Sequence, residues 1–351
     1  MKALVRYSVE KGKLRIQDVP KPILTDNKHA IIKVSTASIC GRDIEHFNTH
    51  LNQDKVPYIL GHEFSGEIHE LPDNHSSDFN ISDRVVCETV LSVCEVCPAC
   101  LNGFYNLCKL RKNIGGTMNG AFSNYVKVPI KYIHSIPDNI SYDEAALIEP
   151  MCVCYNALIV NSDIQENEKI VIIGAGTIAL FCLMLAKYKR ANVIMIAHKK
   201  DILGKKLAKK FGASYVFDSE KNVVNKVLNL TNGFGVPLVI DAVGGVEETF
   251  SNSLECVSPG GQITKIGWFI NNPVKTNLDL IIRKNIRLQG SFSHNNEIWE
   301  QCIRLIAKGH LKLDNIVSKQ LPLDQWQIAF DELVSRNSIK IQLKPLEDNN
   351  G

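Results

Sequence analysis

The sequence predicts an α/β fold in which a doubly wound parallel sheet is combined with a second part built from short strands. Two features predict this arrangement. Strands and helices alternate after about residue 150, and the preceding part reads as short strands and turns. At 351 residues the chain is long enough for two domains, each with its own core.

The first 145 or so residues contain short segments that alternate in part between apolar and polar side chains. Glycine, proline, asparagine and aspartate lie between these segments, as expected for turns. The clearest predicted strands are "HAIIKVSTASI", "GHEFSGEIHEL" and "DRVVCETV".

The pattern changes near residue 150, where "KIVIIGAG" forms a continuous apolar run typical of a buried parallel strand. Strand and helix then alternate at about 20–30 residues per unit, which predicts a doubly wound sheet. The predicted strands are "KIVIIGAG", "NVIMIAH", "YVFD", "PLVIDAVGG", "QITKIGWF" and "IRLQGSFS". The predicted helices between them are "TIALFCLMLAKYKR", "DILGKKLAKKFGA", "KNVVNKVLNLT" and "VEETFSNSLECVS". The last 60 or so residues are mixed, with a helix in "NEIWEQCIRLIAKGH" followed by "LPLDQWQIAFDELVS".

A glycine-rich turn joins the first of these strands to its helix. Gly174, Gly176 and Ala179 form the pattern G-x-G-x-x-A. The first glycine permits a tight turn, the second lets the backbone approach a pyrophosphate, and the small third residue lets helix and strand pack closely. An ordinary strand–turn–helix could show the same pattern, but the alternating units that follow favour dinucleotide binding. The residues expected to contact the cofactor are Gly174, Ala175, Gly176, Thr177, Ile178, His198, Lys199, Lys200, Val243, Gly244, Gly267 and Phe292.

The end of the second predicted strand indicates which dinucleotide is bound. NAD-binding domains usually place an acidic residue there to accept hydrogen bonds from the ribose 2′-hydroxyl. This chain has His198, Lys199 and Lys200 instead, which would attract a 2′-phosphate. We therefore expect NADP(H) rather than NAD(H). Two alternatives stay open: a solvated basic turn that binds nothing, and NAD binding through Asp201 if the strand runs longer.

Four cysteines are concentrated in "SVCEVCPACLNGFYNLCKL", with the spacing C-x2-C-x2-C-x7-C. Cys94, Cys97, Cys100 and Cys108 can close a tetrahedron around zinc with no position left for substrate, so the predicted site is structural. A redox CxxC would use only two of the four. Disulfides are unlikely in a long chain with an odd total of 11 cysteines. The isolated Cys87, Cys182, Cys256 and Cys302 are expected to be buried.

A second set of metal-binding residue types is scattered: Cys40, the pair His62 and Glu63, and Glu149. Each has an ordinary alternative, as a core cysteine, a strand histidine or a residue capping a turn. Together with a cofactor domain that begins just after Glu149, they predict an open zinc site. Such a zinc can polarise an alcohol or carbonyl oxygen.

Composition narrows the other possibilities. The net charge of +3, without a Lys/Arg block, does not suggest nucleic-acid binding. The N-terminus lacks the features of a signal peptide, and no stretch reaches about 18 apolar residues without a charge. We therefore expect a cytoplasmic protein with no membrane partner.

These motifs together resemble the zinc-dependent medium-chain alcohol dehydrogenases, especially their polyol dehydrogenase branch of sorbitol, threonine and sugar-alcohol-phosphate dehydrogenases. The resemblance spans nearly the whole chain and rests on "CGRD", "GHEFSGEI", "DRV", "CLNGFYNLC", "NGAFSNYV", "YDEAALIEP", "GAGTIA", "KKFGA" and "GGQITKIG".

The resemblance implies a GroES-like, mostly β catalytic domain made from residues 1–151 and 293–351, with a structural zinc lobe at about 88–112. A Rossmann domain of residues 152–292 is inserted, and the active site lies in the cleft between the two domains. Cys40 and His62 are implied to bind the catalytic zinc, one of two zinc ions per chain. Glu63 or Glu149 binds it as well, while the other touches the metal-bound water.

The implied function is transfer of hydride between NAD(P) and a secondary alcohol or ketone of a polyol, sugar alcohol or sugar derivative, with or without phosphate. A homodimer or homotetramer is expected. The alternatives are a reductase of simple aldehydes and ketones in the same family, and a non-catalytic cofactor-binding relative.

The sequence departs from the family at its proton relay. The hydroxyl residue expected two positions after the ligand cysteine is Arg42, and the histidine expected five positions after it is Glu45, with His46 next to it. Arg42 cannot relay a proton, because its guanidinium stays protonated. We expect Glu45, Glu63 or Glu149 to serve in its place. Arg42 either holds an anionic group of substrate or cofactor, or forms a structural ion pair. Phe292, Ser293 and His294 are expected to line the site beside the nicotinamide. Related polyol enzymes use charged or phenolic side chains near here to hold substrate hydroxyls, and Ser293 and His294 differ from these.

Overall fold

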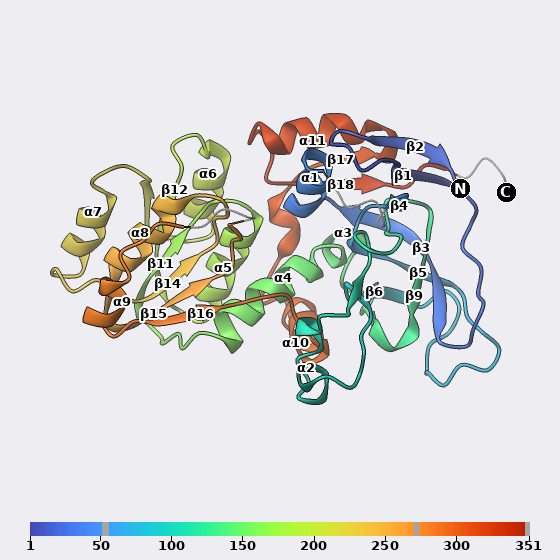
Figure 1. Cartoon of the computed structure of the whole chain (residues 1–351), viewed down its shortest axis with the longest axis horizontal. Coiled ribbons are helices and arrows are strands. Elements are labelled where there is room, and N and C mark those ends of the chain that lie inside the picture. The colour runs from blue at the N-terminus through green and yellow to red at the C-terminus, as the bar shows by residue number, and fades with distance from the viewer. Residues whose placement is uncertain (51–55, 270–273, 348–351) are drawn as a thin grey trace. The chain divides into compact units, whose positions relative to one another are not determined.

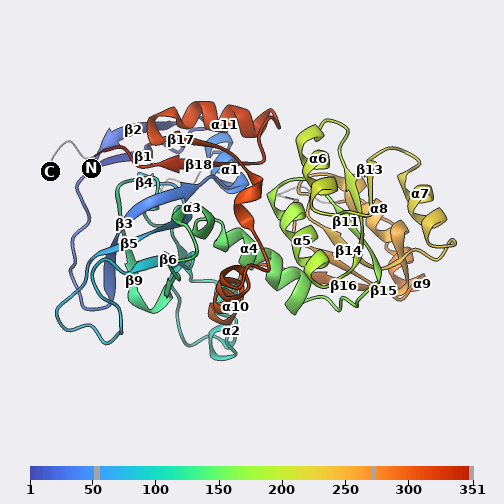
Figure 2. The ribbon, with the colours of Figure 1, turned by 180° about the vertical axis from the view of Figure 1, so that it is seen from behind.

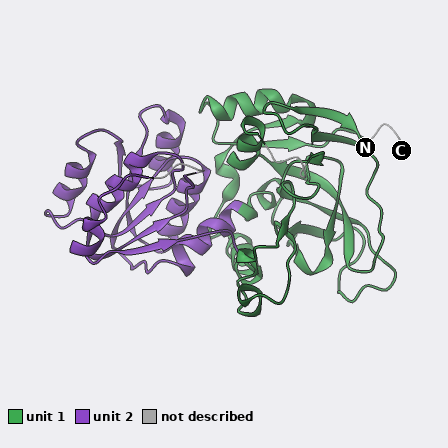
Figure 3. Ribbon diagram, in the orientation of Figure 1, with its two compact units in different colours: residues 1–149, 295–351 green, residues 150–294 purple. Residues whose placement is uncertain are grey.

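The computed structural model describes residues 1–50, 56–269 and 274–347. The chain divides into two compact units (Figure 3): unit 1 comprises residues 1–149 and 295–351, and unit 2 comprises residues 150–294. The sequence places the corresponding boundaries at 151/152 and 292/293. Across the described residues, no helix is long and apolar enough to cross a lipid bilayer.

Unit 2 is built on a parallel sheet with the strand order β13-β12-β11-β14-β15-β16. In chain order this is 3-2-1-4-5-6, the order of a doubly wound dinucleotide-binding fold. The predicted fold class is therefore confirmed for this part. The strands are β11 (Lys169–Ile173), β12 (Asn192–Ala197), β13 (Tyr215–Asp218), β14 (Val236–Asp241), β15 (Val257–Lys265) and β16 (Arg287–Gly290).

The helices of unit 2 cover both faces of this sheet. Figures 1 and 2 show α5 and α6 on one side and α8 and α9 on the other, so β11, β12 and β14 are buried from both sides. This explains why their sequences are continuous apolar runs. The helices are α5 (Thr177–Tyr188), α6 (Ile202–Lys210), α7 (Val223–Leu230), α8 (Glu247–Cys256) and α9 (Asp279–Arg283). Helix α4 (Ile148–Tyr155) carries the chain from unit 1 into unit 2.

Unit 1 is mostly β, and its largest sheet joins the two ends of the chain. In the described residues this sheet runs β10-β6-β5-β3-β18-β17, with β9 also paired to β3. Strand β18, near the C-terminus, pairs antiparallel with β3, near the N-terminus. A smaller sheet runs β2-β1-β4, and β7 pairs with β8. The strands are β1 (Lys2–Arg6), β2 (Leu14–Asp18), β3 (His29–Ser38), β4 (Tyr58–Ile59), β5 (Glu63–Glu70), β6 (Arg84–Cys87), β7 (Val90–Ser92), β8 (Lys112–Asn113), β9 (Tyr125–Pro129), β10 (Ile133–Ser135), β17 (Val317–Pro322) and β18 (Lys340–Lys344).

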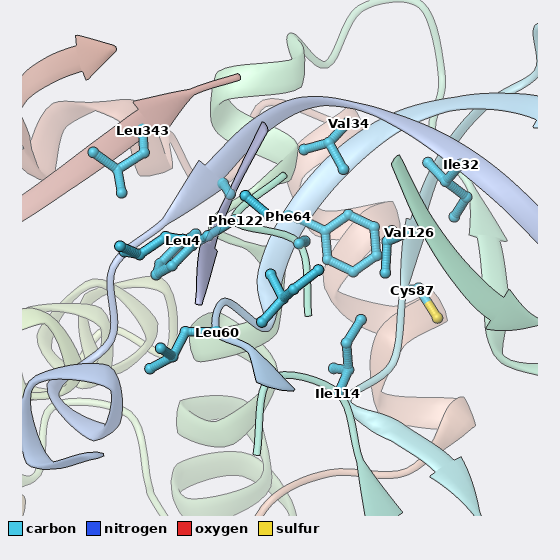
Figure 4. Packing of buried hydrophobic residues seen from close by; sticks show 14 of the residues in the cluster. Leu4, Ile32, Val34, Leu60, Phe64, Cys87, Ile114, Phe122, Val126 and Leu343 are labelled. Atoms are coloured by element: carbon cyan, nitrogen blue, oxygen red, sulfur yellow. The ribbon is translucent and has the colours of Figure 1, made fainter. Parts of the chain in front are cut away.

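The sheets of unit 1 enclose an apolar core, shown in Figure 4. Phe64 and Phe122 lie within it, and Leu343 of β18 belongs to the same cluster as Leu4 of β1. The core therefore also depends on both chain ends. The helices described in unit 1 are α1 (Gly41–Asn48), α2 (Pro98–Leu101), α3 (Tyr142–Ala145), α10 (Asn296–Ala307) and α11 (Trp326–Val334).

Four helices of the described residues, α1 to α4, were not anticipated in the region read as strands and turns. Helix α1 starts directly after Cys40. Its sequence "GRDIEHFN" is only eight residues long and has just Ile44 and Phe47 to form its apolar face. Helix α4 contains Glu149, so this residue does not cap a turn. The isolated cysteines Cys87, Cys182, Cys256 and Cys302 are buried, as predicted.

Candidate metal and cofactor sites

The four clustered cysteines converge in one lobe of unit 1. The ligand atoms of Cys94, Cys97, Cys100 and Cys108 all lie within 4.8 Å of one another. The Sγ–Sγ distances are 3.5 Å for Cys97–Cys100, 3.6 Å for Cys94–Cys108 and 3.9 Å for Cys94–Cys100. Sulfur atoms at the corners of a zinc tetrahedron are about 3.8 Å apart. These residues therefore fit a four-thiolate zinc site.

Backbone groups prepare this lobe for a cation. The N–H groups of Val96 and Cys97 point at the sulfur of Cys94 and lower the pKa of its thiol to about 6. Burial and the neighbouring thiols raise the pKa of Cys100 to about 12. The Cys94 thiol thus ionises readily, whereas the Cys100 thiol resists ionisation because it is surrounded by other sulfur atoms. A bound cation would remove this resistance.

A buried carboxylate attaches the lobe to the rest of unit 1. Glu88 is fully buried; its Oε2 accepts a hydrogen bond of 2.6 Å from the Tyr105 hydroxyl, inside the lobe. Its Oε1 lies 3.3 Å from His134 Nε2 on β10 and accepts a bond of 3.4 Å from Asn296 on α10. The His134 ring stacks on Trp299 at a centroid distance of 5.3 Å. Three distant segments therefore meet at one carboxylate.

We predict that Glu88→Ala destabilises unit 1 by about 3 kcal/mol, because the Tyr105 hydroxyl and the His134 ring lose their buried acceptor. The matched change Tyr105→Phe removes the hydrogen bond to Glu88 Oε2, while Glu88 Oε1 keeps His134 and Asn296 as neighbours. We therefore expect the free energy of unfolding to fall by only about 1 kcal/mol. Urea unfolding followed by tryptophan fluorescence measures both. Equal midpoints for Glu88→Ala and wild type would contradict this account.

The second metal candidate brings together three of the four predicted residues. Atoms of Cys40, His62 and Glu63 lie within 4.8 Å of one another. Cys40 is the residue before α1. His62 directly precedes β5 and Glu63 is its first residue, and β5 pairs with β3, the strand that leads to Cys40. A thiolate, an imidazole and a carboxylate form a typical open zinc site.

Two charged residues that sequence reasoning missed hold these ligands. Asp43 Oδ1 lies 3.6 Å from His62 Nδ1, and Asp43 Oδ2 accepts a 2.8 Å hydrogen bond from the Cys40 N–H. Lys340 of β18 forms a buried ion pair with Glu63 Oε2 and donates a 2.8 Å hydrogen bond to the Ile39 carbonyl. Asp43 is three residues after Cys40, which is a signal that the sequence offered. Lys340 begins the strand KIQLK, and nothing in that sequence marks this lysine as buried.

The charges of this site also fit a divalent cation. Burial raises the pKa of the Cys40 thiol, and the nearby Glu63 raises it further. Burial works against protonation of His62, but Asp43 and Cys40 outweigh it and raise the pKa of His62 well above its usual value. Glu63 Oε1 is buried and has no hydrogen-bond partner among the described residues. A metal ion would give that oxygen a partner and would replace the protons on Cys40 and His62.

Glu149, the fourth predicted residue, is buried beside this cluster but is not part of the group whose ligand atoms meet. Its charge raises the pKa of Glu63, after the larger effect of burial. Burial lowers the pKa of Lys340, but the charge of Glu63 and smaller contributions, among them that of Glu149, raise it above its usual value. In this geometry Glu63 is the carboxylate next to Cys40 and His62, and Glu149 is a neighbouring charge.

The predicted proton-relay positions lie on α1. Arg42 and Glu45 are both in this helix, but neither belongs to the cluster of Cys40, His62 and Glu63. The ring of His46 has a defined partner instead, because its Nδ1 lies 2.8 Å from the Tyr58 hydroxyl. Burial raises the pKa of Tyr58 to about 12. This histidine–tyrosine pair was not anticipated.

In unit 2 the predicted cofactor residues line one edge of the parallel sheet, at the carboxyl ends of its strands. Gly174 has a φ of +121°, and the nearest atoms to a side chain added there would be Ala179 Cβ at 3.2 Å and Val243 Cγ2 at 3.3 Å. A side chain at Gly267 would collide with Val243, and one at Gly244 with Trp268. The Trp268 ring lies 5.3 Å from that of Phe292. The structure therefore brings the loops after β11, β14, β15 and β16 together.

The glycine-rich turn opens the N-terminus of α5. Gly176 is the residue before this helix, and Thr177 and Ile178 form its first turn. A side chain at Gly204 of α6 would strike the Ala175 carbonyl, so α6 packs tightly against the turn. Free N–H groups and the helix dipole favour phosphate at this position.

The basic turn follows β12, which ends at Ala197. His198, Lys199 and Lys200 are all exposed. Asp201 lies before α6, and its carboxylate accepts a 3.2 Å hydrogen bond from the His198 N–H. Asp218, at the end of the neighbouring strand β13, is paired with Lys205. Ser293, with a φ of +58°, and the buried His294 follow β16. The side chain of Asn156 donates a 2.8 Å hydrogen bond to the Ser293 carbonyl.

Comparison with known families supports this arrangement. Residues 26–138 match the model of the alcohol dehydrogenase GroES-like domain, and residues 177–308 match the zinc-binding dehydrogenase model. Among solved structures, a zinc-binding dehydrogenase from Sinorhizobium meliloti bound to NADP superimposes with a TM-score of 0.88 at 26% identity, covering 98% of this chain and 99% of the other.

Curated relatives cover the whole length. The chain is 37% identical to the D-arabitol-phosphate dehydrogenase of Enterococcus avium, over 98% of this chain and 97% of the relative. It is 32% identical to the sorbitol dehydrogenase of Halalkalibacterium halodurans, over 99% of this chain and 100% of the relative. These matches show that the chain is an oxidoreductase of a zinc-binding family whose members use a nicotinamide cofactor. The chain belongs to the zinc-dependent medium-chain alcohol dehydrogenases, in their polyol dehydrogenase branch.

Proposed function

We propose that this enzyme transfers hydride between NADP(H) and a secondary alcohol or ketone of a polyol, sugar alcohol or sugar derivative. The observation that carries the proposal is the buried cluster of Cys40, His62 and Glu63, with an acceptor oxygen that lacks a partner in the described structure. The names of the relatives support a polyol substrate.

Cys40, His62 and Glu63 would hold the catalytic zinc. When bound, zinc supplies Lewis-acid polarisation of an alcohol or carbonyl oxygen. Asp43 orients His62 through the ring nitrogen that faces it and favours the tautomer in which the other nitrogen is free to bind. Lys340 balances the charge of Glu63, which would otherwise be buried next to Glu149. The arrangement thus fixes the ligand geometry before substrate arrives.

The experiment that tests this function is a panel of polyols, sugar alcohol phosphates, aldehydes and ketones, each assayed with NADP and with NAD. We expect oxidation of at least one polyol or its phosphate, with activity lost on zinc chelation and restored by zinc. Turnover of simple aldehydes and ketones without turnover of any polyol would contradict the proposal.

The cofactor preference rests on the basic turn after β12. His198, Lys199 and Lys200 are exposed where a carboxylate would accept the ribose 2′-hydroxyl. The carboxylates nearest in sequence, Asp201 and Asp218, are engaged by the His198 N–H and by Lys205. A 2′-phosphate would gain charge-assisted hydrogen bonds at this turn.

We predict that the double variant Lys199→Ala/Lys200→Ala lowers kcat/KM for NADP by about 10- to 100-fold, and that the value for NAD changes far less. Lys206→Ala, which removes an exposed lysine from α6, is the matched control and should leave the ratio unchanged. A wild-type enzyme that prefers NAD by a hundredfold would show that the basic turn is misinterpreted.

We also propose two zinc ions per chain, one at the four cysteines and one at Cys40, His62 and Glu63. The homodimer or homotetramer and the cytoplasmic location inferred from the sequence stay predictions. Gel filtration with light scattering measures the first, and cell fractionation the second.

A further inference from the structure

A buried ion pair lies at the carboxyl ends of two neighbouring strands of unit 2. Asp241 is the last residue of β14 and Lys265 the last residue of β15, and the two are partners in the parallel register. Lys265 Nζ lies 2.8 Å from Asp241 Oδ2; the Asp241 side chain is fully buried, and that of Lys265 is 15% exposed. The ammonium also lies 4.3 Å from the centroid of the Phe269 ring. Neither member of the pair was singled out from the sequence.

The pair holds the backbone of Val243, the second residue after β14. Asp241 Oδ1 accepts a hydrogen bond of 3.1 Å from the Val243 N–H, and Lys265 Nζ donates one of 2.5 Å to the Val243 carbonyl. The Thr249 hydroxyl, on α8, lies 3.5 Å from Asp241 Oδ2. Both backbone polar groups of Val243 are therefore fixed by one ion pair.

Val243 is packed between two turns at this edge of the sheet. A side chain added at Gly174, in the glycine-rich turn, would have Val243 Cγ2 at 3.3 Å. One added at Gly267, in the turn after β15, would lie 2.2 Å from the Val243 carbonyl. The next residue, Gly244, is equally confined, because a side chain there would lie 2.6 Å from the Trp268 carbonyl oxygen. A shift of Val243 would therefore disturb both the turn expected to receive the pyrophosphate and the turn after β15.

Stability alone is a weak explanation for this pair. A buried ion pair often contributes no more to stability than apolar side chains of similar volume, because both charges lose their hydration. Burial raises the pKa of Asp241 and lowers the pKa of Lys265, even though each charge favours the other. Val243 is partly exposed, so water would hydrate its backbone groups if the pair were removed. What the pair adds is a defined position for this backbone.

The charge of Lys265 has a second effect at this edge. Asp241 is the register partner of Ile173, the residue before Gly174, so it lies one strand away from the glycine-rich turn. An uncompensated carboxylate there would repel the phosphates of a dinucleotide, and charges interact strongly away from water. Lys265 supplies the compensating charge within hydrogen-bond distance.

We propose that Asp241 and Lys265 form a positioning pair for the dinucleotide: they fix the Val243 backbone and, through it, the turns of Gly174 and Gly267. This inference rests on the proposed function, because it assumes that this edge of the sheet binds the cofactor. Neither side chain of the pair takes part in hydride transfer. The pair sets the affinity for the cofactor and contributes little to the stability of unit 2.

The experiment measures binding of NADPH and NADH to the zinc-loaded enzyme by nicotinamide fluorescence, without substrate. The double variant Asp241→Val/Lys265→Met replaces the pair with apolar side chains. Its urea midpoint should stay within about 0.5 M of wild type, whereas its affinity for both dinucleotides should fall by about 10- to 100-fold. Both should weaken because the pair acts on the turn for the shared pyrophosphate, unlike the basic turn after β12.

Kinetics and a conservative change add two readouts. The KM for the cofactor should rise by a factor similar to that of its Kd, while kcat at saturating cofactor should change far less. Lys265→Arg keeps a positive charge and several donors, so it should retain most of the affinity.

Lys284→Met is the matched control. Lys284 Nζ donates to the carbonyls of Leu254, Glu255 and Val257, near the other end of β15, at 2.8 to 2.9 Å. Loss of these hydrogen bonds should lower the urea midpoint and leave both dinucleotide affinities unchanged. This is the reverse of the result expected for the double variant.

Three results would overturn the inference. A double variant that binds both dinucleotides as tightly as wild type would overturn it and leave the proposed function intact. Equal losses of affinity in the double variant and in Lys284→Met would overturn it as well, because they would reflect general loosening of unit 2. A wild type that binds neither dinucleotide would overturn the proposed function and this inference with it. Should the double variant not fold, Asp241→Asn takes its place: it keeps an acceptor for the Val243 N–H but removes the charge, and unchanged affinities would again overturn the inference.

Discussion

Cys40→Ala is expected to lower kcat/KM by about 10³-fold or more and to reduce the zinc content from two ions per chain to one. Loss of the thiolate leaves His62 and Glu63 as an incomplete ligand set, and the polarisation of the substrate oxygen is worth several kcal/mol. Metal analysis of the purified protein and steady-state kinetics measure the two effects together. The zinc at the four cysteines should remain, because its ligands are separate.

A graded change strengthens this test. Asp43→Asn keeps the shape of the residue but removes the negative charge facing His62, so zinc affinity or activity should fall by about 10- to 100-fold. Cys302→Ala, which alters a buried cysteine outside both clusters, is the control and should keep both zinc ions. A Cys40→Ala enzyme with two zinc ions and full activity would refute the assignment of this site.

Cys100→Ala is expected to release the structural zinc and to lower stability first, with activity falling only as the protein unfolds. The three remaining sulfurs cannot close the tetrahedron, and the binding free energy of a structural zinc contributes directly to folding. Thermal unfolding should shift to lower temperature by roughly 10 °C or more, since several kcal/mol are lost.

Two measurements distinguish this outcome from a general defect. At a temperature well below unfolding, Cys100→Ala should retain most of its kcat, whereas Cys40→Ala should not. The zinc content of Cys100→Ala should fall from two ions per chain to one, because the ligands at Cys40, His62 and Glu63 are separate. A protein that still binds two zinc ions and unfolds at the wild-type temperature would show that the lobe is not a zinc site.

The sequence predicted those features that depend on short-range pattern. Gly174, Gly176 and Ala179 are local in the chain, and their roles follow from backbone geometry alone. The four cysteines could be assigned for the same reason, since their spacing restricts them to one lobe. The alternating strands and helices of unit 2 are likewise visible, because each buried strand is a continuous apolar run.

The features that escaped prediction depend on pairings between distant segments. Glu88 joins Tyr105, His134 and Asn296, which a sequence pattern cannot bring together. Helix α1 was missed because it is only eight residues long, and two apolar residues, Ile44 and Phe47, are too few to reveal a helical period. The capping interactions of Cys40 and Asp43 set where it starts.

The contact between Lys340 and the catalytic cluster has a consequence for biosynthesis. Lys340 donates a hydrogen bond to the carbonyl of Ile39, 301 positions earlier in the chain, and forms an ion pair with Glu63 at the start of β5. At a translation rate of about 5–20 residues per second, the ligands Cys40 and His62 emerge from the ribosome roughly 15 to 60 s before the lysine does. The nascent chain must therefore keep Glu63 accessible to water during that interval, and a polypeptide truncated before β18 would carry all three ligands yet lack the counter-charge that lets them be buried.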